Sequence, residues 1–161
     1  MKNLIVLISM VLTLSACVAP PQKMNVAFDA NQFEPYMKQG SATVVGQAFL
    51  KTRGGDVKLG AGNQVELVPI TPYIQERLDR ATANNEKLEP RDSGVLKFVR
   101  TTRADAGGNF EFKNVPAGKY AIYCEITWLV PGVYGDSMTG GLAYGVVTLK
   151  EGESARAIVT R

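Results

Sequence analysis

Apolar and polar residues alternate along several short segments of this chain, and a period of two is typical of half-buried β-strands. The clearest case runs from Asp105 to Trp128. In its first half, Phe110 and Phe112 alternate with polar residues. In its second half, every other residue from Tyr120 onward is apolar or aromatic. A Pro-Ala-Gly turn separates the two halves, so this stretch predicts a β-hairpin built from two core strands.

Five further segments have the composition of strands, with turn residues between them. Val65 and Leu67 should face the core on one of them, and Leu96 and Phe98 should share a face on another. Residues 52–63 are expected to form a glycine-rich connection, and residues 129–140 a long irregular loop. In total about seven strands predict an all-β fold, a Greek-key β-sandwich. The five segments are Thr43–Lys51, Gln64–Pro69, Val95–Thr102, Gly141–Lys150 and Ala155–Thr160.

One segment, residues 72–84, has a helical period instead. It begins at a Thr-Pro pair, a typical helix start. Ile74, Leu78 and Ala81 then share one face, and Glu76 lies four residues before Arg80, the favourable order for an ion pair. We expect one short inserted helix. It either covers the edge or end of the sandwich, or it docks a partner.

The N-terminus carries a targeting signal. The apolar run from Leu4 to Leu14 is shorter than the about 20 residues that a membrane-spanning helix needs. It has the length of the apolar part of a signal peptide. The sequence Leu-Ser-Ala-Cys17 that ends it resembles the bacterial lipobox. The resemblance implies a signal peptide over residues 1–16, cleavage before Cys17 and acylation of that cysteine. The alternative is an ordinary secretory signal.

An acylated Cys17 would anchor the protein stably, because each buried methylene contributes about 0.8 kcal/mol and several chains are attached. By analogy with lipoprotein sorting, Val18 in place of Asp favours the outer membrane, facing the periplasm or the cell surface. Residues 17–40 are expected to form a lipidated tether of roughly 25–30 Å as a coil. The segment Ala27–Met37 is more apolar than a spacer requires, so it either packs onto the domain or contacts a partner.

The composition argues against most catalytic chemistry. The chain contains no histidine, which removes Ser-His and Cys-His nucleophile systems and the commonest metal ligand. Its net charge of +3 is too small to indicate a nucleic-acid partner. The glycine-rich stretch 52–63 has neither P-loop spacing nor a following helix. Asp105 and Asp136 are the only acids considered for carboxylate chemistry, and both have the setting of turn residues. We therefore expect no catalytic residue, metal site or cofactor, and a buried, inert Cys124.

From Asp105 to Tyr120 the sequence follows the pattern Asp-x-x-Gly-x-Phe-x-Phe-x-Asn-Val-Pro-Ala-Gly-x-Tyr. This resembles the carboxypeptidase regulatory-like domain, a transthyretin-like (prealbumin-like) sandwich similar to the B-type repeats of surface adhesins. The resemblance spans residues 41–161 and implies an accessory or structural module rather than an enzyme.

These observations predict a non-enzymatic, membrane-anchored lipoprotein whose sandwich binds a protein or glycan of the cell envelope. The alternative is a structural subunit of an envelope assembly, such as a secretion or conjugation apparatus. Aromatic residues on loops over a rigid sandwich commonly form recognition sites. Tyr134, Met138 and Tyr144 are therefore the candidate partner-binding residues.

Overall fold

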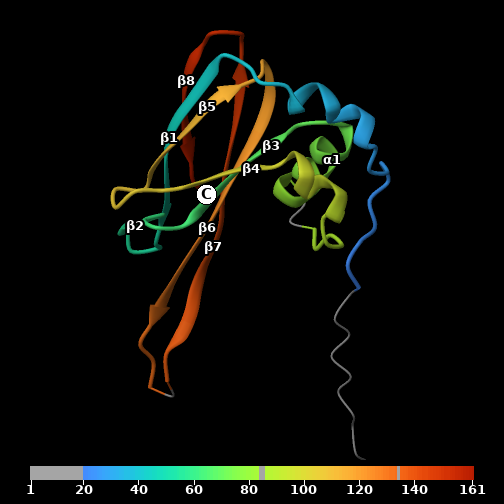
Figure 1. The fold of residues 1–161 in the computed structure, drawn as a ribbon. Coiled ribbons are helices and arrows are strands. Elements are labelled where there is room, and N and C mark those ends of the chain that lie inside the picture. Colours follow the sequence, from blue (N-terminus) through green and yellow to red (C-terminus); the bar gives the residue numbers. More distant parts are fainter. Residues whose placement is uncertain (1–19, 84–85, 134) are drawn as a thin grey trace, which may run out of the picture.

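The structure, a computed structural model, describes residues 20–83, 86–133 and 135–161 and is a β-sandwich of two four-stranded sheets (Figure 1). In the first sheet the central strand β1 (Ala42–Lys51) pairs antiparallel with β2 (Val57–Leu59) and β5 (Asn109–Val115), and parallel with β8 (Ser154–Val159). The second sheet is antiparallel, with the order β4-β3-β6-β7. Its strands are β3 (Gln64–Pro69), β4 (Arg100–Arg103), β6 (Gly118–Val130) and β7 (Ser137–Leu149). The predicted β-sandwich is confirmed, with eight strands instead of about seven.

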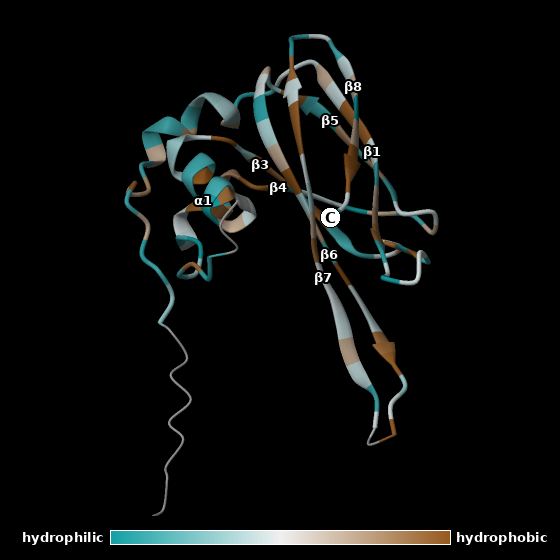
Figure 2. Ribbon diagram, turned by 180° about the vertical axis from the view of Figure 1, so that it is seen from behind, coloured by the Kyte–Doolittle hydropathy of each residue, from teal (hydrophilic) through white to brown (hydrophobic). Residues whose placement is uncertain are grey.

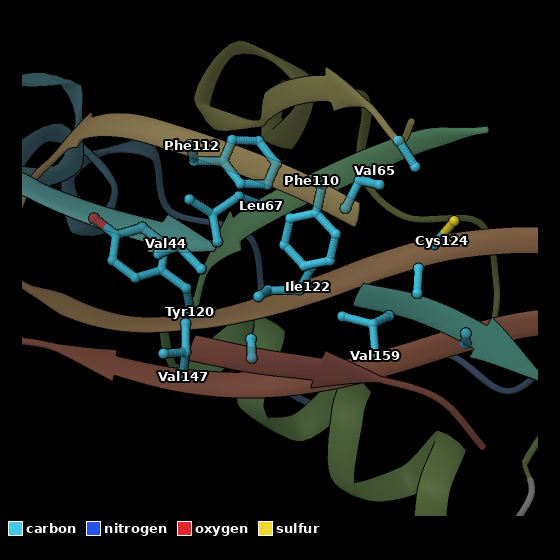
Figure 3. Close-up of a cluster of buried hydrophobic side chains, with 14 of the residues drawn as sticks. Val44, Val65, Leu67, Phe110, Phe112, Tyr120, Ile122, Cys124, Val147 and Val159 are labelled. Atoms are coloured by element: carbon cyan, nitrogen blue, oxygen red, sulfur yellow. The ribbon is translucent and has the colours of Figure 1, made fainter. Parts of the chain in front are cut away.

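The core lies between the two sheets and follows the alternation seen in the sequence. Val65 and Leu67 of β3 are fully buried, as expected. Phe110 of the first sheet and Ile122 of the second point into one shared cluster (Figure 3). Cys124 belongs to the same cluster and is a free, buried thiol, and its burial raises its pKa.

The predicted hairpin between Phe110 and Trp128 is wrong in one respect. Both segments are core strands, but β5 pairs with β1 whereas β6 pairs with β3 and β7. The turn at Pro116 therefore carries the chain from one sheet to the other. The Tyr120 hydroxyl donates a hydrogen bond of 2.9 Å to the Pro116 carbonyl oxygen and holds this crossing. Alternation defines which face of a strand is buried, but it does not define the hydrogen-bonding neighbour.

A helical layer covers the outer face of the second sheet. It consists of the α-helix α1 (Pro72–Ala83) and three 3-10 helices, η1 (Ala30–Gln32), η2 (Glu34–Met37) and η3 (Ser93–Phe98). Val68 on the outer side of β3 packs against Phe33, Tyr73, Ile74 and Val95 in a second hydrophobic cluster. The inserted helix is thus confirmed, and it covers a sheet face. The expected ion pair between Glu76 and Arg80 forms at 3.0 Å.

The strand predicted over Val95–Thr102 is wrong in its first half, where the chain forms η3 instead. Asp92 caps this 3-10 helix by accepting a hydrogen bond of 2.7 Å from the Gly94 amide. As a result Val95 is buried while Leu96 is 59% exposed, which breaks the expected alternation. Only Arg100–Arg103 pairs as a strand, along β3.

The segment before β1 packs onto the domain, so this alternative for Ala27–Met37 is confirmed and a free coil over that range is wrong. Phe33 is fully buried and stacks on Phe98, with ring centroids 4.9 Å apart. Further upstream, the Glu76 carboxylate accepts hydrogen bonds from the backbone amides of Asn25 (2.9 Å) and Val26 (2.7 Å). Cys17 lies outside the described residues. In the described ranges, no helix is both long enough and apolar enough to cross a membrane.

The long irregular loop predicted for residues 129–140 is also wrong. The strands β6 and β7 are 13 residues each and remain paired as far as Val130 and Ser137. Their ends form an arm, residues 125–142, that projects from the sandwich (Figure 1). Gly140, the last residue of the predicted loop, lies within β7 with a φ of 116°. A Cβ there would overlap the Ile126 carbonyl oxygen, so the glycine permits close strand pairing.

Candidate functional site

A cavity of about 620 Å³ lies between α1 and the outer face of the second sheet. We call it the α1 cavity. Its floor contains a cross-strand row in which Glu66 of β3 pairs with Tyr123 of β6, and Tyr123 pairs with Tyr144 of β7. These side chains point outward because their neighbours Ile122 and Cys124 point into the core.

The walls come from three other parts of the chain. Ile74, Arg77 and Leu78 of α1 form one side, and Leu88 and Arg91 in the connection after the helix form another. At the third side, Thr160 exchanges backbone hydrogen bonds with Tyr144, both 3.2 Å long.

This bridge brings Arg161 to the cavity, where its guanidinium lies beside Gly141. The volume is within the about 300–1,000 Å³ of typical small-molecule sites.

The arginines of the cavity are in different electrostatic situations. Arg91 forms an ion pair of 3.1 Å with Glu66, and this neutralises both groups. Arg77 donates a hydrogen bond of 2.8 Å to the Glu89 carbonyl oxygen, so its charge has only a neutral acceptor there. In the part of the chain that the structure describes, Arg161 has neither an ion pair nor a side-chain hydrogen bond. The positive charge at this end of the cavity is therefore available to a ligand.

The second acid of the lining, Glu86, is engaged. It accepts a hydrogen bond of 2.7 Å from Arg80 on the outer side of α1. Arg80 also pairs with Glu76, and the two carboxylates raise the pKa of its guanidinium.

The two tyrosines supply the aromatic surface. Burial raises the pKa of Tyr123, so its hydroxyl remains protonated and able to donate. Among the described residues, neither the Tyr123 nor the Tyr144 hydroxyl has a hydrogen-bond partner. The cavity therefore offers two phenol rings with hydroxyls and a free guanidinium. This combination suits a polar ring compound with a negatively charged group.

The candidate residues named from the sequence do not converge. Tyr144 lies in the α1 cavity, whereas Met138 lies on the arm and is 67% exposed. Tyr134 and Cys17 fall outside the described residues. Sequence reasoning missed Tyr123, whose only signal was a large aromatic residue on the polar face of a core strand. It also missed Arg161, which no local pattern connects to Tyr144.

The acids considered for catalysis serve as turn residues. Asp105 accepts hydrogen bonds of 2.8 Å from the amides of both Gly107 and Asn109, and the Asn109 side chain also donates to it. These bonds, those from Asn109 first, lower the pKa of Asp105. Asp136 lies in the turn of the arm, outside any cavity described above. The described ranges contain no group of three or more His, Cys, Asp or Glu residues that could hold a metal ion.

Comparison with known proteins finds solved structures that are similar to this chain. No family model matches the chain, and no curated protein sequence does. A crystal structure of a Pseudomonas aeruginosa protein, proposed to be a carbohydrate-binding protein, superposes with a TM-score of 0.70 at 23% identity. The match covers 83% of this chain and 97% of that one, and it shows a common fold.

Two pilins are also similar, at 14% identity each. The major pilin subunit of Bacillus cereus has a TM-score of 0.38, with 76% of this chain and 30% of the pilin covered. The major pilin of Corynebacterium diphtheriae has a TM-score of 0.32, with 78% and 33% covered.

Proposed function

We propose that the protein is a non-enzymatic binding module of the bacterial cell envelope, and that the α1 cavity binds a carbohydrate with an acidic group. The observation that carries this proposal is the pairing of Tyr123 and Tyr144 on the cavity floor, beside Arg161, which forms no ion pair with any described residue. Sugar rings pack their apolar faces on aromatic rings, and their hydroxyls exchange hydrogen bonds with phenol groups. A guanidinium binds a carboxylate or phosphate in bidentate geometry.

The solved structure with the common fold supports the same ligand class, because that protein is itself proposed to bind carbohydrate. The resemblance to carboxypeptidase regulatory-like domains agrees with an accessory role. In this proposal, acylation of Cys17 anchors the module to the outer membrane. A carbohydrate ligand would then be one exposed at the envelope, on the side where the module is held.

The binding test uses the purified acylated protein in a detergent without a sugar headgroup. Calorimetry compares an oligogalacturonate with the matched neutral galacto-oligosaccharide. We expect Tyr144→Ala to weaken binding of both at least tenfold, and Arg161→Gln to weaken only the acidic ligand. Val146→Ala is the matched control, because Val146 points outward from the same strand, is 45% exposed and does not line the cavity. Absence of binding, or equal affinity of all variants, would refute the carbohydrate site.

Two further measurements test the other parts of the proposal. Metabolic labelling with a palmitate analogue should mark the wild type but not Cys17→Ser. An unlabelled wild type would remove the anchor and leave the cavity proposal intact. Incubation with the bound oligosaccharide should release no products, and turnover would show that the protein is an enzyme.

A further inference from the structure

The end of the β6–β7 arm exposes an unusual group of apolar side chains. Leu129, Val130 and Met138 are 58%, 41% and 67% exposed, and Val133 in the turn is 96% exposed. Figure 2 shows the corresponding brown segments at the end of β6 and in the turn. The sequence from 125 to 142 contains no Lys or Arg, and its only acids are Glu125 and Asp136.

Packing within the domain does not account for this group. β3 pairs with β6 only as far as Val65 and Cys124, so β6 and β7 pair only with each other beyond that point. Their ladder continues to Val130 and Ser137, which satisfies the inner backbone groups of the arm. Such a hairpin can place its tip at an apolar boundary without unfolding.

The location of the first described residues, which follow the proposed anchor on Cys17, indicates that this apolar boundary is a membrane surface. The first described residues, which are blue in Figure 1, and the tip of the arm lie toward the same end of the molecule (Figures 1 and 2). Only two residues, Val18 and Ala19, separate Cys17 from Pro20, so the Cα atoms of Cys17 and Pro20 are at most about 11 Å apart. An acyl anchor on Cys17, which is part of the function proposed above, would hold this end of the molecule against the bilayer.

We propose that the tip of the β6–β7 arm is a second membrane contact, in which Leu129, Val133 and Met138 enter the boundary between headgroups and acyl chains. Penetration of about 5–10 Å is typical of such interfacial elements. The arm would orient the sandwich relative to the membrane, which a lipid anchor alone does not do. Because the arm has no basic residue, the contact is apolar and should not require anionic lipid.

The test uses depth-dependent quenching of a single tryptophan in the full acylated protein. Trp128 is the chain's single tryptophan, so Trp128→Phe provides a silent background. Into it we would introduce either Val133→Trp at the tip or Leu96→Trp on η3. Leu96 is the control because it is also an exposed apolar residue, at 59% against 96% for Val133, but lies on η3 and not on the arm. Both proteins are bound to phosphatidylethanolamine vesicles with or without brominated acyl chains, and flotation confirms that they are bound.

We expect bromolipid to quench the tryptophan at position 133 at least threefold more than the one at position 96, with or without added phosphatidylglycerol. Equal, weak quenching of the two in floated protein would overturn the membrane contact while leaving the anchor in place. Strong quenching at 133 in a protein that carries no palmitate label would keep the contact and remove the anchor. Photocrosslinking from position 133 to a protein instead of lipid in cells would also overturn the proposal.

Discussion

Replacing Phe33 by alanine tests whether the segment before β1 unfolds together with the sandwich or is a strap, a segment that lies on the sandwich and detaches before it unfolds. The Phe33 side chain is fully buried. Its ring centroid lies 5.4 Å from that of Phe28 and 4.9 Å from that of Phe98. Burial of a phenylalanine removes at least about 150 Å² from water, worth about 4 kcal/mol at 25 cal/mol per Å². Measured Phe→Ala losses of about 3–5 kcal/mol in protein cores agree with this figure.

A loss of about 4 kcal/mol is large for a domain whose total stability is of the order of 5–15 kcal/mol. For a chain of this size it should lower the melting temperature by roughly 8–16 °C. The assay is urea denaturation followed by circular dichroism, together with a thermal melt. Met37→Ala, in the same segment, is the control. Met37 is 58% exposed, so its substitution should change the free energy of unfolding by less than about 0.5 kcal/mol.

The alternative makes a different prediction for the same variants. A strap that detaches before the sandwich unfolds contributes little to the global transition. Phe33→Ala would then cost less than about 1 kcal/mol, similar to Met37→Ala, and the assignment of this segment to the folding unit would be refuted.

Three further changes test other parts of the structure. Hydrogen bonds from the backbone amides of the segment before β1 and, to a smaller extent, from the Arg80 side chain lower the pKa of Glu76 to about 2 from an ordinary value of 4.5. The stabilising effect of these bonds is therefore complete above pH 4.5 and is lost as the pH falls toward 2. Hydrogen exchange at the Val26 amide should accelerate over that range, and Glu76→Gln should make exchange fast already at pH 6; a pH-independent rate would contradict this. Burial shields the Cys124 thiol and raises its pKa, so it should react with iodoacetamide only at the rate of global unfolding. Rapid labelling of the native protein would show that the thiol is accessible in the folded state. Gly140→Ala should distort the arm without unfolding the sandwich, seen as amide chemical-shift changes confined to β6 and β7, and an unchanged spectrum would show that the pairing tolerates a side chain.

The alternation in the sequence predicted which side chains are buried far better than it predicted strand neighbours. Phe110 and Tyr120 both face the core, as their patterns indicated. A short turn between two such strands is compatible with a hairpin in one sheet or with a crossing between sheets, because both place the apolar faces inward. The hydrogen bond from Tyr120 to Pro116 stabilises the crossing.

The other differences come from residues whose usual role is overridden by tertiary structure. A coil tether was expected over residues 17–40, but Phe33 supplies enough buried surface to hold its later part on the sheet. Gly140 ends the segment that was expected to be a loop, but it serves a close strand contact instead.

The α1 cavity was the least predictable feature, because it combines residues that are distant in sequence. Glu66, Arg77, Tyr144 and Arg161 belong to different segments, and only the fold brings them together. Tyr144 was selected as a loop aromatic, yet it lies on a strand. Its pairing with Tyr123 depends on the register of β6 and β7, which periodicity alone does not fix.

The length of β6 connects the cavity to the arm. Its residues from Tyr120 to Ile126 supply the core on one face, and Tyr123 supplies the cavity floor on the other. Trp128 still packs partly against the core, but the residues of β6 beyond it contribute no buried side chain to the core. Exposed apolar strand ends are an aggregation liability that sandwiches normally avoid by keeping strands short. Four described residues at the end of the arm, Leu129, Val130, Val133 and Met138, nevertheless expose apolar side chains. The surplus length is therefore best explained by a contact outside the chain, and a nearby bilayer would shield these side chains from water.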